Sequence, residues 1–97
     1  MTQPPPAPAE ITAESVRDWL AASIAARLGV PAGQVRADRY VDELNLDSVD
    51  AVLVARDLEA WLGEELGREV LRRRATLEEL GAYLARRHAL AAHRGGL

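Results

Sequence analysis

The chain has 97 residues, of which 48% are apolar and 4% aromatic, with no phenylalanine and no cysteine. This length holds one small domain, and a core of Leu, Val, Ile and Ala suits helices packed side by side. The lack of cysteine excludes disulfides, thiolate metal sites and a thiol nucleophile, and a net charge of −3 gives no bulk electrostatic support for nucleic-acid binding.

The first ten residues are rich in proline and alanine, which favours an extended tether over a packed element. We therefore predict a disordered Pro-rich tail over residues 1–10. The chain start lacks the basic-then-apolar order of a signal peptide, and no apolar run approaches the roughly 18 residues of a membrane span. A cytoplasmic protein without membrane insertion is the expectation.

A first helix is predicted to begin after Thr12, a good N-cap, with Ile11 packing against Val16. Apolar residues then recur at every fourth position, and Trp19 lies beside them. Gly29 in a left-handed conformation, followed by Pro31, is expected to end the helix. The predicted apolar stripe consists of Val16, Leu20, Ile24 and Leu28.

Residues 31–46 are predicted to form a long connection that packs across the helices, because it contains apolar anchors. The anchors are Val35, Tyr40, Val41 and Leu44. Asp47 is then expected to cap a second helix that starts at Ser48, places Asp50 at the third position and stops before Gly63. The core face of this helix is predicted to contain Ala51, Val54, Ala55, Leu58 and Leu62, with Trp61 at its margin.

The segment 64–75 has only a short apolar pair, Val70 and Leu71, enough for one or two turns of helix. Thr76 and Glu79 form a capping box that opens the last helix, with Leu77, Leu80 and Leu84 inward. We expect this helix to fray near His88. The predicted fold is an all-α, four-helix bundle over residues 11–90, with three longer helices and one short helix, followed by a disordered tail over residues 91–97.

Ser48 is predicted to stand at the mouth of the second helix, open to solvent and easy for another protein to modify. No local base accompanies it: the Gly-x-Ser-x-Gly elbow is absent, and His88 and His93 lie in or beyond the last helix. A serine hydrolase is therefore disfavoured, and the two histidines lack companion ligands for a metal. A simpler interpretation is that Asp47 and Ser48 only start a helix.

The stretch Leu46-Asp47-Ser48, preceded by a helix and a long loop and followed by Thr76-Leu77-x-x-Leu80, resembles the acyl carrier protein family. Within that family, residues 44–52 and 57–63 are similar to polyketide-type carriers, including those loaded by fatty acyl-adenylate ligases. The resemblance implies a 4'-phosphopantetheine, derived from coenzyme A, on Ser48, with Asp47 as the flanking motif residue. Its terminal thiol would hold an acyl group as a thioester.

The resemblance also implies partners and a carrier that catalyses nothing itself. The expected partners are a phosphopantetheinyl transferase, an acyl-adenylate ligase or acyltransferase that loads the arm, and a ketosynthase or another acyl-accepting enzyme. A monomer is expected, without nucleic acid. The sequence departs from the family at Asn45, where glycine is usual, and at 72–75, where aromatic, acidic and proline residues are common.

Beside Ser48, a partner-docking face is predicted from Val49, Asp50, Leu53 and Arg56; the alternative is that Val49 and Leu53 pack under the long loop. The run 72–74 of three arginines is either a contact patch for an acidic partner or for phosphates, or a solvated surface. Asp42 and Glu43 are interpreted as solvated.

Two other functions stay open at this point. A peptidyl carrier of nonribosomal synthesis shares the fold and the arm but usually has Gly-Gly-x-Ser at its site. An unmodified helical interaction module would use the face beside Ser48 without any cofactor.

Overall fold

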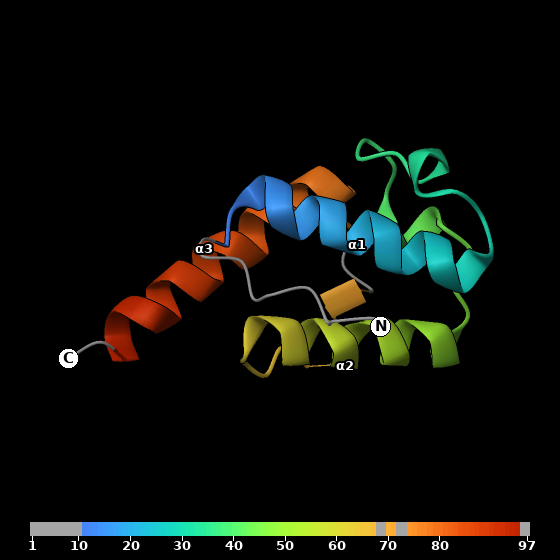
Figure 1. The fold of residues 1–97 in the computed structure, drawn as a ribbon. Coiled ribbons are helices and arrows are strands. Elements are labelled where there is room, and N and C mark those ends of the chain that lie inside the picture. The colour runs from blue at the N-terminus through green and yellow to red at the C-terminus, as the bar shows by residue number, and fades with distance from the viewer. Residues whose placement is uncertain (1–10, 68–69, 72–73, 96–97) are drawn as a thin grey trace, which may run out of the picture.

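The computed structural model describes residues 11–67, 70–71 and 74–95, all arranged as helices and connections (Figure 1). No β-strand occurs in these ranges, so the predicted all-α class is confirmed. The elements are α1 (Ala13–Leu28), η1 (Ala32–Gln34), η2 (Val41–Glu43), α2 (Ser48–Leu62) and α3 (Leu77–Gly95), where η denotes a short 3-10 helix.

The short helix expected within residues 64–75 is not confirmed as a fourth helix. Val70 and Leu71 have 3-10 geometry and are buried, as their apolar character predicts. The predictions for the tail 1–10, for Arg72 and Arg73, and for residues 96–97 fall outside the described residues.

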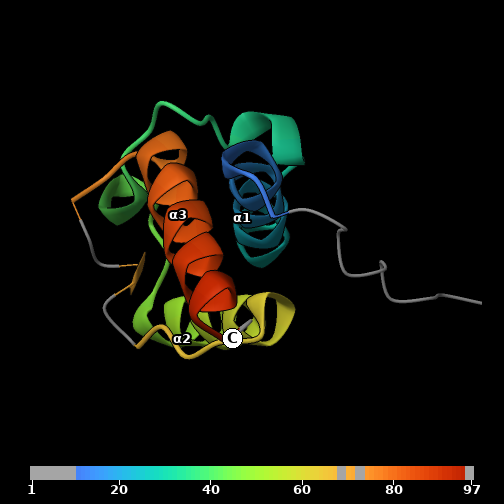
Figure 2. The same ribbon diagram turned by 90° about the vertical axis from the view of Figure 1, so that its left-hand side faces the viewer.

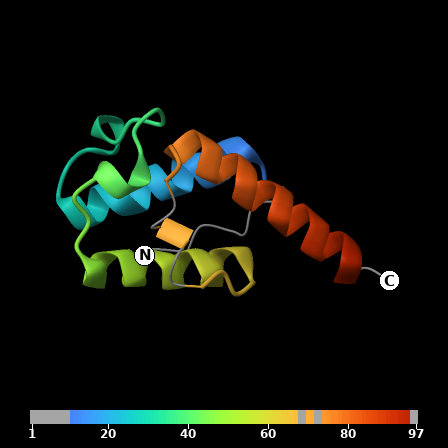
Figure 3. The same ribbon diagram turned by 180° about the vertical axis from the view of Figure 1, so that it is seen from behind.

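The three α-helices form two layers around one core. In Figure 2, α1 and α3 lie side by side and α2 crosses beneath them. Seen from behind, the C-terminal part of α3 extends past the ends of the other helices (Figure 3). The buried apolar set comes from all three helices and from the long connection: Val16, Leu20, Ile24, Ala25, Val35, Val41, Leu44, Val54, Ala55, Leu58, Leu62, Val70, Leu71, Leu77, Leu80 and Leu84.

The core faces predicted for the first and second helices agree with this buried set, except for one residue of each face. Leu28 and Ala51 are half-buried against the core, whereas the other predicted members are buried. Trp61 is half-buried at the margin of α2, as predicted, and its ring stacks on that of Trp19 with 5.3 Å between centroids and 13° between planes. This stacked pair joins α1 to α2.

The local signals at both ends of α1 have the predicted geometry. Thr12 Oγ1 accepts a hydrogen bond from the Ser15 N–H at 3.0 Å, and Ser15 Oγ accepts one from the Thr12 N–H at 2.9 Å. At the other end Gly29 has φ 72°, and the Val30 N–H donates to the Ala25 carbonyl at 3.0 Å. These bonds satisfy backbone groups that the helix itself leaves unpaired.

The long connection is bonded to the start of α3. The Val41 N–H donates to the Ala75 carbonyl at 2.9 Å, and the Leu77 N–H donates to the Arg39 carbonyl at 3.2 Å. Three of the four predicted anchors are buried, and Tyr40 is half-buried. The connection is therefore part of the fold and carries η2 to the N-terminal end of α2.

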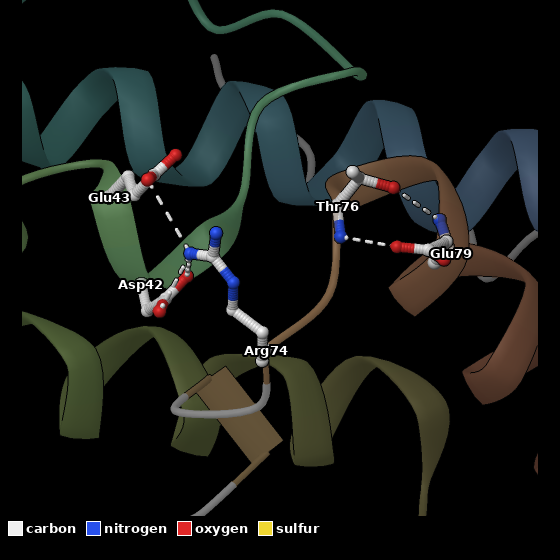
Figure 4. Close-up of polar contacts among 5 residues, drawn as sticks. All are labelled: Asp42, Glu43, Arg74, Thr76 and Glu79. Atoms are coloured by element: carbon white, nitrogen blue, oxygen red, sulfur yellow. Dashed lines mark hydrogen bonds and ion pairs between the residues drawn. The ribbon is translucent and has the colours of Figure 1, made fainter.

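Helix α3 begins with the predicted capping box: Thr76 Oγ1 accepts from the Glu79 N–H at 3.1 Å, and the Glu79 carboxylate accepts from the Thr76 N–H at 2.9 Å (Figure 4). The predicted end near His88 is wrong, because α3 continues to Gly95. Residues 91–95, expected in a disordered tail, are thus helical. Alanine, leucine and arginine dominate residues 82–94 and favour helix, and no glycine occurs between Gly81 and Gly95.

Candidate functional site

The entrance to α2 depends on a left-handed residue. Asn45 has φ 61°, the one positive φ of a residue other than glycine in the described chain. Asparagine tolerates this conformation better than most residues, so the turn forms here without glycine. The turn follows buried Leu44 and precedes half-buried Leu46, which fixes where the helix begins.

Asp47 and Ser48 occupy the helix positions that the sequence predicts. Asp47 is the N-cap, and its Oδ1 accepts a hydrogen bond from the Asp50 N–H at 2.8 Å. Ser48 is the first residue of α2 and is exposed. The cap engages Oδ1 of Asp47 and places the neighbouring Ser48 hydroxyl at the exposed mouth of the helix.

A hollow of about 410 Å³ lies beside Ser48. Its wall combines apolar and polar side chains from η2, from the turn before α2, from the first turns of α2 and from the segment that precedes α3. The lining residues are Val41, Asp42, Asn45, Leu46, Asp47, Ser48, Ala51 and Leu71. An extended, partly polar arm that leaves Ser48 could contact the apolar and the polar side chains of this wall, so the lining fits a phosphopantetheine.

The chemistry available to the chain at Ser48 is limited. Among the described residues, no hydrogen bond joins the Ser48 hydroxyl to a base. His88 lies within α3, and its buried Nδ1 has no hydrogen-bond partner in the same set. No cluster of metal-ligating side chains occurs in the described ranges. Among the described residues, the site therefore presents an exposed hydroxyl without a hydrogen-bonded base.

The predicted docking face is partly open. Val49 is 66% exposed and Arg56 is exposed, whereas Asp50 and Leu53 are half-buried. Val49 therefore does not pack under the long connection, which was the alternative interpretation. Val52 is also exposed, and the sequence analysis did not include it in this face. Helical periodicity predicts the side of α2 on which a residue lies, but it does not predict how far the neighbouring loops cover that side.

Sequence reasoning also missed a charged cluster next to the hollow. Arg74 Nη1 lies 3.2 Å from Asp42 Oδ1 and 3.4 Å from Glu43 Oε2 (Figure 4), so these carboxylates are paired and not merely solvated. Partial desolvation lowers the pKa of Arg74, but the hydrogen bonds and charges of Asp42 and Glu43 outweigh it and raise the pKa. The two segments are 32 residues apart, and no local pattern joins them.

None of the helices in the described ranges is both long and apolar enough to cross a membrane.

Comparison with known proteins identifies the family to which the chain belongs. The family model for the phosphopantetheine attachment site matches residues 18–84, which include α2 and Ser48. The chain is 39% identical over 66 residues to a phenolphthiocerol/phthiocerol polyketide synthase protein of Mycobacterium tuberculosis, covering 68% of this chain and 4% of that synthase. The chain therefore corresponds to a small segment of that relative.

Two further similarities cover most of both matched chains. The acyl carrier protein TtuC of Teredinibacter turnerae is 32% identical over 75 residues, which is 77% of this chain and 86% of TtuC. The NMR structure of the HMG-ACPI domain from the CurA module of Lyngbya majuscula matches with a TM-score of 0.73 at 20% identity, over 95% of this chain and 93% of that domain, and supports the fold. The chain thus belongs to the phosphopantetheine-attachment family and is a carrier domain homologous to TtuC and to a segment of the polyketide synthase.

Proposed function

We propose that Ser48 bears the 4'-phosphopantetheine and that the chain carries acyl groups as thioesters on this arm. The observation that carries the proposal is an exposed hydroxyl at the first position of α2, beside a hollow and within the segment matched by the attachment-site model. Asp47 supports the site as the cap that fixes the start of the helix.

The bond-forming step of attachment uses only a hydroxyl of this chain. A bond forms between Ser48 Oγ and the phosphorus that bears the pantetheine of coenzyme A, the pyrophosphate bond breaks and adenosine 3',5'-diphosphate leaves. The hydroxyl proton passes to a base of the transferase, since none of the described residues offers one at Ser48. The chain acts as a non-catalytic substrate and shuttle, and partner enzymes perform the chemistry.

The names of the relatives favour polyketide or related lipid and natural-product biosynthesis as the setting. We infer a monomeric four-helix carrier in the cytoplasm that meets a phosphopantetheinyl transferase, a loading ligase or acyltransferase, and a ketosynthase or another acyl-accepting enzyme. The docking face of Val49, Asp50, Leu53 and Arg56 lies on the same helix as the proposed attachment serine, so a partner seated there would face the arm.

The test is intact-protein mass after incubation with coenzyme A, Mg²⁺ and a broad-specificity phosphopantetheinyl transferase. We expect one phosphopantetheine on the wild type and on the control Ser23→Ala, whose serine lies in α1, and none on Ser48→Ala. Modification of Ser48→Ala would refute the assigned residue. A folded wild type that stays unmodified would favour the unmodified interaction module.

A second readout follows from the composition. The chain has no cysteine, so any thiol that a thiol reagent detects after the reaction belongs to the arm. One reactive thiol per chain is expected in the modified wild type and none in Ser48→Ala. Blocking of this thiol on incubation with a loading enzyme and an acyl donor would identify the thioester.

A further inference from the structure

Arg74 connects the segment that leads into α3 with the short helix η2. Its Nη1 lies 3.2 Å from each carboxylate oxygen of Asp42 and 3.4 Å from Oε2 of Glu43 (Figure 4). Its guanidinium also covers the ring of Tyr40, with 3.8 Å between Cζ and the ring centroid. A guanidinium that is stacked on a ring and paired with two carboxylates retains few orientations.

The carboxylate that Arg74 approaches most closely belongs to the wall of the hollow beside Ser48. Asp42 and its neighbour Val41 line the hollow, and so does Leu71 from the segment that precedes Arg74. Arg74 is not among the lining residues. Arg74 can therefore influence the hollow through the residues it contacts, of which Asp42 lines the hollow itself.

The backbone beside Arg74 is fixed independently of its side chain. The Val41 N–H donates to the carbonyl of Ala75 at 2.9 Å, so the guanidinium extends from an anchored point. Helix η2 comprises Val41–Glu43, a single turn of 3-10 helix with poorer hydrogen-bond geometry than an α-helix. A side-chain contact can therefore add to this backbone bond in holding the turn in place.

We propose that Arg74 is a positioning residue for the modification of Ser48. Its ion pairs with Asp42 and Glu43 hold η2 where this turn shapes the hollow through which the arm leaves the serine. The proposal rests on the assignment of Ser48 as the attachment residue. Lysine would restore the charge but not the planar contact with Tyr40 or the paired contact with Asp42, so it would replace arginine only in part.

A role in site geometry can be separated from a role in stability. The side chain of Arg74 is 60% exposed and that of Asp42 is 38% exposed. Exposed ion pairs contribute little to the stability of a fold. Substitution of Arg74 should therefore leave the unfolding midpoint nearly unchanged, and any change in the rate of modification then reflects the site.

The experiment measures the initial rate of arm transfer to wild type, Arg74→Gln, Arg74→Lys and the matched control Arg36→Gln. Arg36 pairs with Asp38 in the same long connection and does not line the hollow. We expect kcat/KM for the carrier to fall about two- to fivefold in Arg74→Gln, the range of one exposed ion-pair network. The loss should fall on kcat, with Arg74→Lys intermediate and Arg36→Gln unchanged.

A double-mutant cycle with Asp42→Asn tests the path of the effect. If Arg74 acts through its ion pairs, the double variant is no slower than the slower single variant, because Arg74→Gln already removes the contact that Asp42→Asn removes. Independent, multiplying losses would overturn the proposal, as would an Arg74→Gln protein modified at the wild-type rate. A folded wild type that is not modified at all would overturn the Ser48 assignment as well, so the two failures are distinguishable.

Discussion

Asn45 shows how a single backbone conformation sets the entrance to the proposed attachment site. Its φ of 61° turns the chain between buried Leu44 and the N-cap Asp47. Residues with a Cβ adopt this conformation at a cost, and β-branched residues at the highest cost, whereas glycine adopts it freely. Position 45 therefore accepts few side chains.

We predict that Asn45→Val lowers the free energy of unfolding by about 1–2 kcal/mol, the cost of a left-handed conformation for such a residue. Asn45→Gly is the matched control, because it keeps the conformation and removes the side chain. Its stability should stay within about 1 kcal/mol of wild type. Denaturant titration measures both, and equal losses in the two variants would show that the side chain of Asn45, and not its φ, is what the turn requires.

For single residues, the sequence predicts those positions that are set by hydrogen bonds between residues close together in the chain. The cap at Asp47, the first helical position of Ser48 and the capping box at Thr76 each involve residues within one turn of helix, and the structure confirms their helix positions. The contact between Arg74 and Asp42 depends on how two distant segments meet, so no local pattern predicts it. The attachment role of Ser48 stays a prediction until the mass experiment.

Among the elements, α1 and α3 approach each other closely at Gly81. A Cβ built at buried Gly81 of α3 would lie 2.7 Å from the carbonyl oxygen of Ala13 and 3.1 Å from the amide nitrogen of Arg17. Both are backbone atoms of α1, which cannot move aside as a flexible side chain can. Glycine at this position therefore lets the two helices pack.

We predict that Gly81→Ala destabilises the protein although alanine favours helix. Overpacking typically costs about 1–3 kcal/mol, and the gain in helix propensity returns about 1 kcal/mol, so a net loss of up to about 2 kcal/mol is expected. Gly33→Ala is the control, since nothing lies within 4 Å of a Cβ there. Thermal unfolding compares the two, and a Gly81→Ala protein as stable as the control would mean that α1 and α3 separate without cost.

The loop after α2 is held by one carboxylate of that helix. Oε2 of Glu59 accepts hydrogen bonds from the Leu66 N–H at 2.7 Å and the Gly67 N–H at 3.3 Å. These bonds favour the charged form and, together with the charge of Arg56, lower the pKa of Glu59 against an opposing effect of desolvation. The loop contact is consequently linked to pH.

The sign of this linkage is fixed by the lowered pKa. The contribution of Glu59 is present above the ordinary glutamate pKa of about 4.3 and is lost as pH falls through the lower pKa of the folded protein. We predict that Glu59→Gln is less stable than wild type at neutral pH and that the difference shrinks on acidification. Unfolding midpoints across this range test it against Glu14→Gln, a change at an exposed glutamate in the first turn of α1. A difference that is constant with pH would contradict the linkage.

The end of α3 illustrates a limit of prediction for elements. The capping box fixes the start of the helix, but residues 88–94 contain mainly good helix formers and no breaker, so nothing local stops the helix before Gly95. The expected boundary near His88 was therefore too early. Starts and ends marked by a cap or a left-handed glycine, such as Thr12 and Gly29, were predicted correctly.

For the molecule as a whole, the bundle could be predicted from apolar spacing, but the shape of the hollow could not. The helical spacing of apolar residues along the sequence predicts which residues enter the core, and nearly every predicted core residue is buried. The hollow requires that η2, the start of α2 and the segment before α3 meet, which depends on the backbone bonds between the long connection and α3. Such contacts arise only from the assembled fold.

The stacked pair of Trp19 and Trp61 gives this protein a built-in optical probe. The chain contains only these two tryptophans, one on α1 and one on α2, and neither lines the hollow beside Ser48. Their emission and their near-ultraviolet circular dichroism therefore report the spacing of α1 and α2. An acyl chain that entered between these helices would part the rings and alter the signal, whereas a chain left in solvent on its arm would leave the signal unchanged.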